Sequence, residues 1–333
     1  MQHKRRLFII ILLCFISVFA SSCAKPNGAE EDKKGQETTC DYQVDFIDVG
    51  EGDSIFIKFP DGKTMLVDCG EKGEKNYQKI SGCITQSGAD KIDYLVITHP
   101  DSDHAGNALN IIQNFDVGVA FIPDIISSKL VFYQNYSEFY QTLIEKEIEK
   151  KYSSFYSCIK GEDYFVAFLT PTPKAINGSE YTEFNSAESP TESQSNSLSP
   201  IIYVEIRGVR FVLMGDAPEK QEKKALENLK LNAEKHYEYY GLNVNLENVD
   251  FLKVSHHGSA DASCEEFLEV LAPNNAIISV GANNYYGHPS TQVLKRLERA
   301  NENYTLYRTD VCGTVSVKGY GEQVKVEVEI GKK

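Results

Sequence analysis

Three features are scarce in this sequence, and each shortage excludes a class of protein. Long apolar runs are scarce, and the run at residues 7–20 is too short to span a bilayer comfortably. No two cysteines form a Cys-x-x-Cys pair, so a structural zinc site is not indicated. Basic residues are also scarce: the sequence has 34 lysines and arginines but 48 aspartates and glutamates, which gives a formal net charge of −14. Such a surface repels polyanions unless the site is locally positive, which makes tight nucleic-acid binding doubtful.

The N-terminus has the pattern of an export signal. Cations at residues 4–6 precede the apolar run, and Cys23 follows it after small residues. We predict a signal peptide over residues 1–22 and a disordered tether over 23–40, because the tether is polar and has no apolar face. The favoured outcome is an exported lipoprotein, anchored to the membrane on the cell surface through Cys23. Ordinary cleavage and free secretion is the alternative. Loss of residues 1–22 removes three cations and no acids, and shifts the net charge from −14 to −17.

Cysteines also occur throughout the rest of the chain. Six lie beyond Cys23: Cys40, Cys69, Cys83, Cys158, Cys264 and Cys312. Export would permit disulfides between them, but the sequence does not choose among the possible pairings. Buried free thiols are an equally open alternative.

The strongest chemical signal is a group of metal-binding side chains on one short stretch. Four of them fall within six residues: His99, Asp101, Asp103 and His104. A β-prone apolar run at 92–97 precedes them, and apolar residues at helical spacing follow at 105–115. The group is therefore expected on a loop at the C-terminal end of a strand, where α/β folds place their chemistry. A polar helix N-terminus is the alternative, but a cap needs one acid rather than two acids and two histidines.

Further candidate ligands follow other predicted strands, because one loop cannot encircle a metal ion. Asp216 comes directly after an apolar strand at 209–214, and His256 and His257 follow a strand at 249–254. We favour His256 as the ligand and leave His257 for support or substrate contact, although the sequence does not settle the choice. Imidazole and carboxylate ligands together suit a dication such as zinc or manganese.

The His-x-Asp-x-Asp-His sequence at 99–104 resembles the His-x-His-x-Asp-His motif of the metallo-β-lactamase superfamily, with Asp101 in place of the second histidine. That variant is typical of the ComEC-like branch, which is related to the soluble domain of a DNA-uptake protein. Two more stretches are similar to that branch. One is Asp-Val-Gly-Glu-Gly-Asp at 48–53, with Glu for the usual Gln, and the other is Asn-x-Tyr-Gly-His-Pro at 284–289.

The resemblance implies the fold. The 333 residues suffice for one large domain or two small ones, and a hydrophobic content of 41% supports a full core. We expect an α/β (α+β) chain folded as a four-layer αββα sandwich over residues 41–333, with an insertion around 124–200. Within the insertion we predict an amphipathic helix over 133–152. The polar stretch at 177–199 is expected to be a surface loop, with a lid as the alternative.

The resemblance also implies two divalent metal ions, zinc or manganese, bridged by Asp216. His99 and Asp101 are expected on one ion, and Asp103, His104 and His256 on the other. Asp103 and His288 are the catalytic candidates, His288 because it could contact a phosphoryl group or donate a proton. The candidates for support or substrate contact are Asp48, Asp53, Asp68, His257 and Asn284. The chain has no histidine between His104 and Asp216, so one ligand that is usual in the superfamily is missing. One of the two metals is therefore expected to be held less tightly.

The activity implied is metal-dependent hydrolysis of phosphodiesters, as in a nuclease. Carboxylate-rich sites favour harder metals, which suit anionic phosphoryl oxygens. One alternative is an envelope esterase acting on phosphorylcholine-bearing teichoic acids, and another is a non-catalytic metal-binding surface lipoprotein. The expected partners are a phosphodiester or cell-envelope substrate, and the membrane through the lipid anchor.

Overall fold

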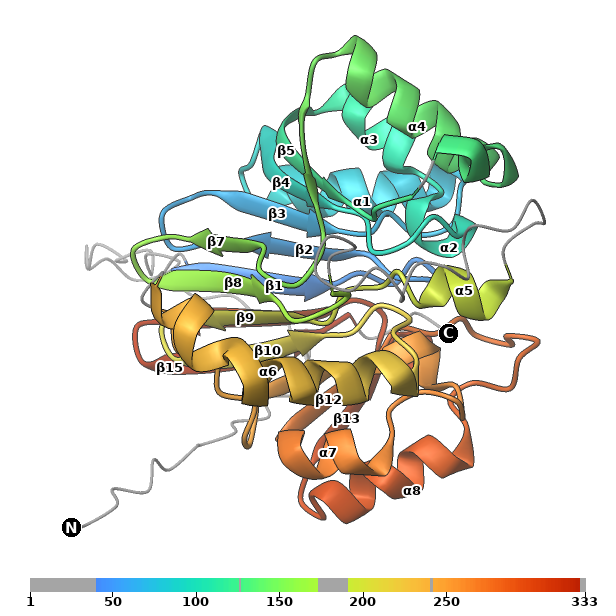
Figure 1. The fold of residues 1–333 in the computed structure, drawn as a ribbon. Helices are drawn as coiled ribbons and strands as arrows, with labels where there is room; N and C mark the ends of the chain where they lie inside the picture. Colours follow the sequence, from blue (N-terminus) through green and yellow to red (C-terminus); the bar gives the residue numbers. More distant parts are fainter. Residues whose placement is uncertain (1–39, 126, 173–190, 240–241, 330–333) are drawn as a thin grey trace, which may run out of the picture.

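Two β-sheets face each other at the centre of the molecule in the computed structural model (Figure 1). The structure describes residues 40–125, 127–172, 191–239 and 242–329. The predicted signal peptide and all but one residue of the predicted tether lie outside these ranges. Within them, no helix is both long and apolar enough to cross a membrane.

The first sheet joins both ends of the described chain. Its strands run in the order β15-β14-β1-β2-β3-β4-β5-β6. They are β1 (Tyr42–Phe46), β2 (Ile55–Lys58), β3 (Thr64–Val67), β4 (Lys91–Val96), β5 (Asp116–Ile122), β6 (Glu149–Tyr152), β14 (Val315–Tyr320) and β15 (Gln323–Val328). Strands β3 to β6 pair in parallel and the others antiparallel. The C-terminal ends of β3 and β4 therefore meet at one edge.

The second sheet repeats this arrangement. Its order is β13-β12-β11-β10-β9-β8-β7. The strands are β7 (Cys158–Lys160), β8 (Tyr164–Phe168), β9 (Ile202–Ile206), β10 (Val209–Leu213), β11 (Phe251–Lys253), β12 (Asn275–Ile278) and β13 (Thr305–Arg308). Strands β10 to β13 are parallel, so the C-terminal ends of β10 and β11 also lie side by side.

Helices cover the outer face of each sheet (Figure 1). Over the first sheet lie α1 (Glu74–Gln86), α2 (Ser102–Ala105), α3 (Ala108–Asn114) and α4 (Gln134–Glu145), with the 3-10 helix η1 (Ser127–Phe132). Over the second lie α6 (Glu219–Tyr239), α7 (Glu265–Leu271) and α8 (Thr291–Ala300). Three further short helices lie within the described residues: α5 (Glu192–Asn196), the 3-10 helix η3 (Ser255–Gly258) and α9 (Thr309–Cys312). Figure 1 shows α2 and α5 at the same end of the sheets.

Strand β2 shows why this stacking is stable. Ile55 and Ile57 pack between the two sheets, whereas Phe56 packs under the helices, and all three are buried. Successive side chains of a strand point to opposite faces, so a sheet covered on both faces needs an uninterrupted apolar strand. The predicted four-layer αββα sandwich is confirmed.

Within the insertion, one prediction is wrong and another is only partly tested. The helix expected over 133–152 ends with α4 at Glu145, and β6 then adds to the edge of the first sheet beside β5. Glu147 adopts a left-handed φ of 55°, and Ile148 alone is apolar in a charged run, so the helical apolar face ends there. Of the predicted loop at 177–199, residues 177–190 lie outside the described ranges. Of the remainder, residues 192–196 form α5, which packs at the candidate site described below.

The six cysteines that follow Cys23 are free thiols in the structure. Cys83 donates its S–H to Asp45 Oδ2 over 2.9 Å, and Cys69 is fully buried. Of the two alternatives left open by the sequence, the structure favours free thiols.

Candidate metal centre

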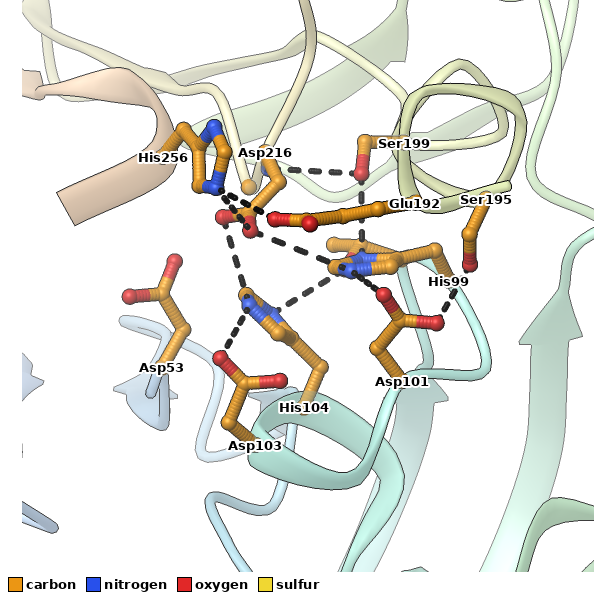
Figure 2. Close-up of polar contacts among 12 residues, drawn as sticks. Asp53, His99, Asp101, Asp103, His104, Glu192, Ser195, Ser199, Asp216 and His256 are labelled. Carbon is orange, nitrogen blue, oxygen red and sulfur yellow. Dashed lines mark hydrogen bonds and ion pairs between the residues drawn. The ribbon is translucent and has the colours of Figure 1, made fainter. Parts of the chain in front are cut away.

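The candidate site forms where strand ends from both sheets meet. Asp68 follows β3, the metal loop of residues 99–104 follows β4, Asp216 follows β10, and the histidine pair 256–257 follows β11. Segments far apart in the chain thus contribute to one cluster, which Figure 2 shows in close-up. A backbone hydrogen bond ties the metal loop to the turn before β2: Asp53 N–H donates to the carbonyl oxygen of Asp103 over 3.2 Å. A side-chain carbon at Gly52 would overlap that same oxygen.

The most compact part of the cluster contains four side chains. His104 Nε2 lies 3.2 Å from Asp216 Oδ1 and 3.7 Å from Asp103 Oδ2. His257 Nε2 lies 3.4 Å from Asp103 Oδ2 and 3.6 Å from Asp216 Oδ1. One ligand atom from each residue falls within 4.8 Å of all the others. We call Asp103, His104, His257 and Oδ1 of Asp216 the inner half-site.

The inner half-site is fixed from behind by buried acceptors. His104 Nδ1 lies 2.8 Å from Asp68 Oδ2, and His257 Nδ1 lies 2.8 Å from the carbonyl oxygen of Ser279. These contacts place a proton on each Nδ1 and aim each Nε2 into the cluster. Both Nε2 atoms and Asp216 Oδ1 are buried and have no hydrogen-bond partner among the described residues. Buried polar atoms rarely stay unpaired, so this convergence fits a divalent metal ion.

A second group of donors surrounds the other oxygen of Asp216. His99 Nε2 lies 3.6 Å from Asp101 Oδ2 and 3.9 Å from Asp216 Oδ2. His256 Nε2 lies 3.7 Å from the same Asp216 oxygen. We call His99, Asp101, His256 and Oδ2 of Asp216 the outer half-site. Asp216 stands between the two half-sites with one oxygen toward each (Figure 2).

The outer half-site is supported by hydroxyl groups and by an exposed carboxylate. His99 Nδ1 lies 3.1 Å from the hydroxyl oxygens of both Thr98 and Ser199. His256 Nδ1 lies 3.4 Å from Asp261 Oδ1, and the Asp261 side chain is 69% exposed. The hydroxyl group of Ser195, on α5, donates to Asp101 Oδ1. Water can therefore reach the support of His256, whereas Thr98, Ser195 and Ser199 are buried.

Opposite charges shift the ionisation of the inner half-site. Burial opposes protonation of His257, but the carboxylates of Asp216 and Asp103 outweigh it and raise the pKa of this histidine to about 9. The same balance raises the pKa of His104 well above its usual value. Burial favours the neutral acid at Asp216, yet His104 and His257 hold the pKa of this carboxyl well below its usual range. The carboxylates here thus favour a positive charge, from protons or from a metal ion.

The histidine pair is oriented differently from the sequence-based expectation. We favoured His256 for the ion held by Asp103 and His104, whereas the structure brings His257 to these residues and His256 to the outer half-site. Both histidines adopt a left-handed backbone, with φ values of 47° and 52°. Their rings consequently diverge, with centroids 6.1 Å apart and planes at 69°. Sequence position alone does not reveal that geometry.

The predicted supporting residues divide into those behind the cluster and those outside it. Asp68 holds His104, as described above. Asp53 forms a buried ion pair of 2.7 Å with Lys253, and its other oxygen lies 3.7 Å from His257 Nδ1. Asp48 instead accepts from Gly50 N–H and pairs with Lys79, so it shapes the Gly-rich turn rather than the metal cluster.

The loop that carries His288 lies beside the outer half-site. The ring centroid of His288 is 5.8 Å from that of His256, and the ring of Tyr286 stacks with His288 at 5.6 Å. Asn284 accepts from the backbone N–H of His288 and donates to its carbonyl oxygen. Asn284 therefore braces the loop, and His288 is the member that faces the cluster.

Sequence reasoning missed four residues that the structure brings to the cluster: Glu192, Ser195, Ser199 and Lys253. Three of them lie at 192–199, where a Ser-rich composition resembles any polar loop. Ser199 Oγ accepts from Asp216 N–H in addition to its contact with His99. Lys253 carried a usable signal, because a single cation in a buried strand needs a buried partner.

Comparison with known proteins yields a family match and two long relatives. The family model described as metallo-beta-lactamase superfamily matches residues 47–282. ComE operon protein 3 of Bacillus subtilis (strain 168) is 28% identical over 291 residues, which cover 83% of this chain and 33% of that protein. Recombination protein 2 of Haemophilus influenzae is 26% identical over 323 residues, covering 96% of this chain and 32% of that protein. The chain thus spans about a third of the length of these curated relatives.

A solved structure supports the fold assignment. A variant of the CmlA beta-hydroxylase aligns with a TM-score of 0.50 and 12% sequence identity. The alignment covers 83% of this chain and 54% of that chain. At this level of identity the likeness shows the fold alone.

Proposed function

Because the chain belongs to the metallo-β-lactamase superfamily, we propose that it is a metal-dependent hydrolase of phosphodiesters. Members of the superfamily usually bind divalent metal ions, and the His/Asp cluster could hold them. We assign one ion to the inner half-site and one to the outer half-site, with Asp216 shared. When bound, such ions polarise a phosphoryl oxygen and lower the pKa of a water molecule.

One observation supports this assignment above the others. Asp216 directs Oδ1 toward His104 and His257, and directs Oδ2 toward His99 and His256. A carboxylate with donors gathered at each of its two oxygens is what a paired-metal centre requires. Paired centres suit in-line displacement at phosphorus, because they stabilise both the attacking and the leaving oxygen.

The residues of the chain itself would orient the ligands and move a proton. Asp68 and Ser279 hold the inner imidazoles in the tautomer that presents Nε2 to the cluster. Burial and the neighbouring His256 lower the pKa of His288, which favours the neutral ring. We propose that His288 contacts the phosphoryl group and donates a hydrogen bond to it. Asp103, the other catalytic candidate, is assigned here as an inner ligand.

A substrate panel tests the proposal. Bis(p-nitrophenyl) phosphate, single-stranded DNA, a phosphorylcholine ester and a cephalosporin are each incubated with the protein, with and without added manganese or zinc. We expect metal-dependent cleavage of at least one phosphodiester. Asp216→Asn should abolish it while Asp90→Asn, at an exposed position, should not. Cleavage of the cephalosporin alone, or full activity in Asp216→Asn, would overturn the proposal.

The phosphodiester substrate could belong to either of two classes, a nucleic acid or a phosphorylcholine ester. Separate observations favour each class. The relative named Recombination protein 2 favours a nucleic-acid substrate. Two exposed aromatics, Tyr285 and the His288-stacked Tyr286, favour a phosphorylcholine ester instead, because aromatic faces bind quaternary ammonium groups. The acidic net charge of −14 also favours a short or zwitterionic substrate over a long polyanion. Preference for DNA over the phosphorylcholine ester at low salt would identify the nuclease branch.

We further propose that the protein is an exported lipoprotein anchored through Cys23. The support is the pattern at residues 4–23, which lies outside the described residues. Cys23→Ala should release the protein from the membrane fraction, whereas Cys40→Ala should not. Unchanged membrane retention of Cys23→Ala would contradict the lipid anchor.

A further inference from the structure

We propose that Glu192 of α5 is an additional ligand of the outer half-site, and that this carboxylate makes the half-site selective for a harder cation than the inner one. The inference rests on the proposed metal-dependent function. Residues 105–215 contain no histidine, and Glu192 belongs to that interval. Figure 2 shows α5 beside the outer half-site.

Glu192 lies at a ligand-like separation from one member of the outer half-site, His256. Its Oε1 lies 3.6 Å from His256 Nε2, and that nitrogen lies 3.7 Å from Asp216 Oδ2. Two ligands that share an ion held at about 2.0 to 2.2 Å stand at similar separations. Figure 2 shows the Glu192 side chain extending from α5 toward His256, and 70% of this side chain is exposed.

An unsatisfied buried group points to the same place. His99 Nε2 is fully buried and has no hydrogen-bond partner among the described residues. It faces the space bounded by Asp101 Oδ2 and Asp216 Oδ2. An ion there would satisfy this nitrogen, whereas a plain ion pair between Glu192 and His256 would leave it unpaired.

Helix α5 is anchored well enough to present a ligand. The side chain of Thr191 accepts from Gln194 N–H, and Gln194 in return accepts from Thr191 N–H, a capping box that fixes the start of the helix at Glu192. At its other end, the carbonyl oxygen of Ser197 accepts from Gln221 of α6 over 2.8 Å. Between these anchors, Ser195 holds Asp101. One short helix thus supplies a ligand and the support of another.

The ligand chemistry then separates the two half-sites. With Glu192, the outer half-site has carboxylates from Asp101, Asp216 and Glu192 beside two imidazoles. The inner half-site has two carboxylates, from Asp103 and Asp216, beside two imidazoles. Oxygen ligands suit manganese and magnesium, and imidazoles suit zinc. The outer ion should therefore be the harder and more readily exchanged of the two.

Metal competition tests the inference without any substrate. Wild type, Glu192→Gln, Glu192→His and the control Glu145→Gln, an exposed carboxylate at the end of α4, are dialysed against graded manganese and zinc. Bound metal is measured by mass spectrometry and bound manganese by electron paramagnetic resonance. We expect Glu192→Gln to weaken the outer manganese about 10- to 100-fold or more, with the inner ion unchanged. Glu192→His should shift outer selectivity toward zinc.

A second pair of variants separates a ligand from a simple ion pair. If Glu192 only pairs with His256, the manganese loss caused by Glu192→Gln disappears in a His256→Gln background. If Glu192 is a ligand, that loss persists there. Unchanged manganese affinity in Glu192→Gln, disappearance of the effect without His256, or no selectivity shift in Glu192→His would each overturn the inference. Wild type that shows Glu192-dependent manganese binding but cleaves no phosphodiester would remove the proposed function and leave this inference standing.

Discussion

The inner half-site is held from behind by buried groups alone, whereas the outer half-site is held by buried hydroxyls and by one largely exposed carboxylate. Asp68, which supports His104, is fully buried, while Asp261, which supports His256, is 69% exposed. Behind the inner half-site the buried Asp53–Lys253 pair also ties the two sheets together. Two centres that share Asp216 can thus differ in how firmly their ligands are preorganised, and the four predictions below test that difference.

The largest expected effect is on stability, at Lys253. Lys253→Met leaves Asp53 as a buried charge without its partner, which should lower the free energy of unfolding by about 3 to 5 kcal/mol. Urea denaturation of the metal-free protein measures it. The control is Lys79→Met, which breaks the partly exposed pair with Asp48 and should cost about 0 to 1 kcal/mol. Equal losses of unfolding free energy in the two variants would show that the buried Asp53–Lys253 pair stabilises the fold no more than a partly exposed pair does.

Next in size is the contrast between the two adjacent histidines. His257→Ala removes a ligand from the compact inner half-site and should lower hydrolysis by about 1,000-fold, equivalent to several kcal/mol of lost stabilisation. His256→Ala should lower it by about 10-fold to 100-fold, because water can take a place in the more open outer half-site. Steady-state rates and metal content of both variants provide the measurement. A larger loss of activity in His256→Ala than in His257→Ala would instead support His256 as the inner ligand.

A smaller effect is expected behind His104. Asp68→Asn keeps an acceptor for Thr98 N–H and tolerates the left-handed φ of 59° at this position, so the fold should persist. The variant removes the charge that holds His104, and the inner ion should bind about 10- to 100-fold more weakly. Titration with a metal chelator measures the change. Asp48→Asn is the matched control, and an equal loss there would contradict a specific role for Asp68.

The smallest effect is expected on α5. Ser195→Ala removes the hydroxyl that donates to Asp101, which should weaken the outer ion by no more than about tenfold, the equivalent of one hydrogen bond. Ser193→Ala changes an exposed serine of the same helix and should have no effect. Manganese titration of both variants measures this. A loss at the inner half-site in Ser195→Ala would mean that α5 supports the cluster as a whole.

Residues adjacent in sequence were predictable, and residues brought together by folding were not. His99 to His104 occupy one loop after a strand, so their pattern indicated a metal site directly. Glu192 and Ser195 reach the same cluster from nearly a hundred residues away, on a stretch whose composition fits a loop. The His256 and His257 roles depend on two left-handed φ values that no sequence pattern specified. Helix α4 was predicted too long because helical spacing was extended across a charged run that pairs as β6.

The overlap that any side chain at Gly52 would have with the Asp103 carbonyl oxygen has a consequence for protein engineering. The metal loop cannot be transplanted into another scaffold as a hexapeptide, since its shape depends on a second segment that contributes no ligand. A functional graft would have to carry the glycine turn with it. By the same reasoning, Gly52→Ala should displace Asp103 and weaken metal retention although no ligand residue is changed, and a screen limited to ligand residues would overlook it.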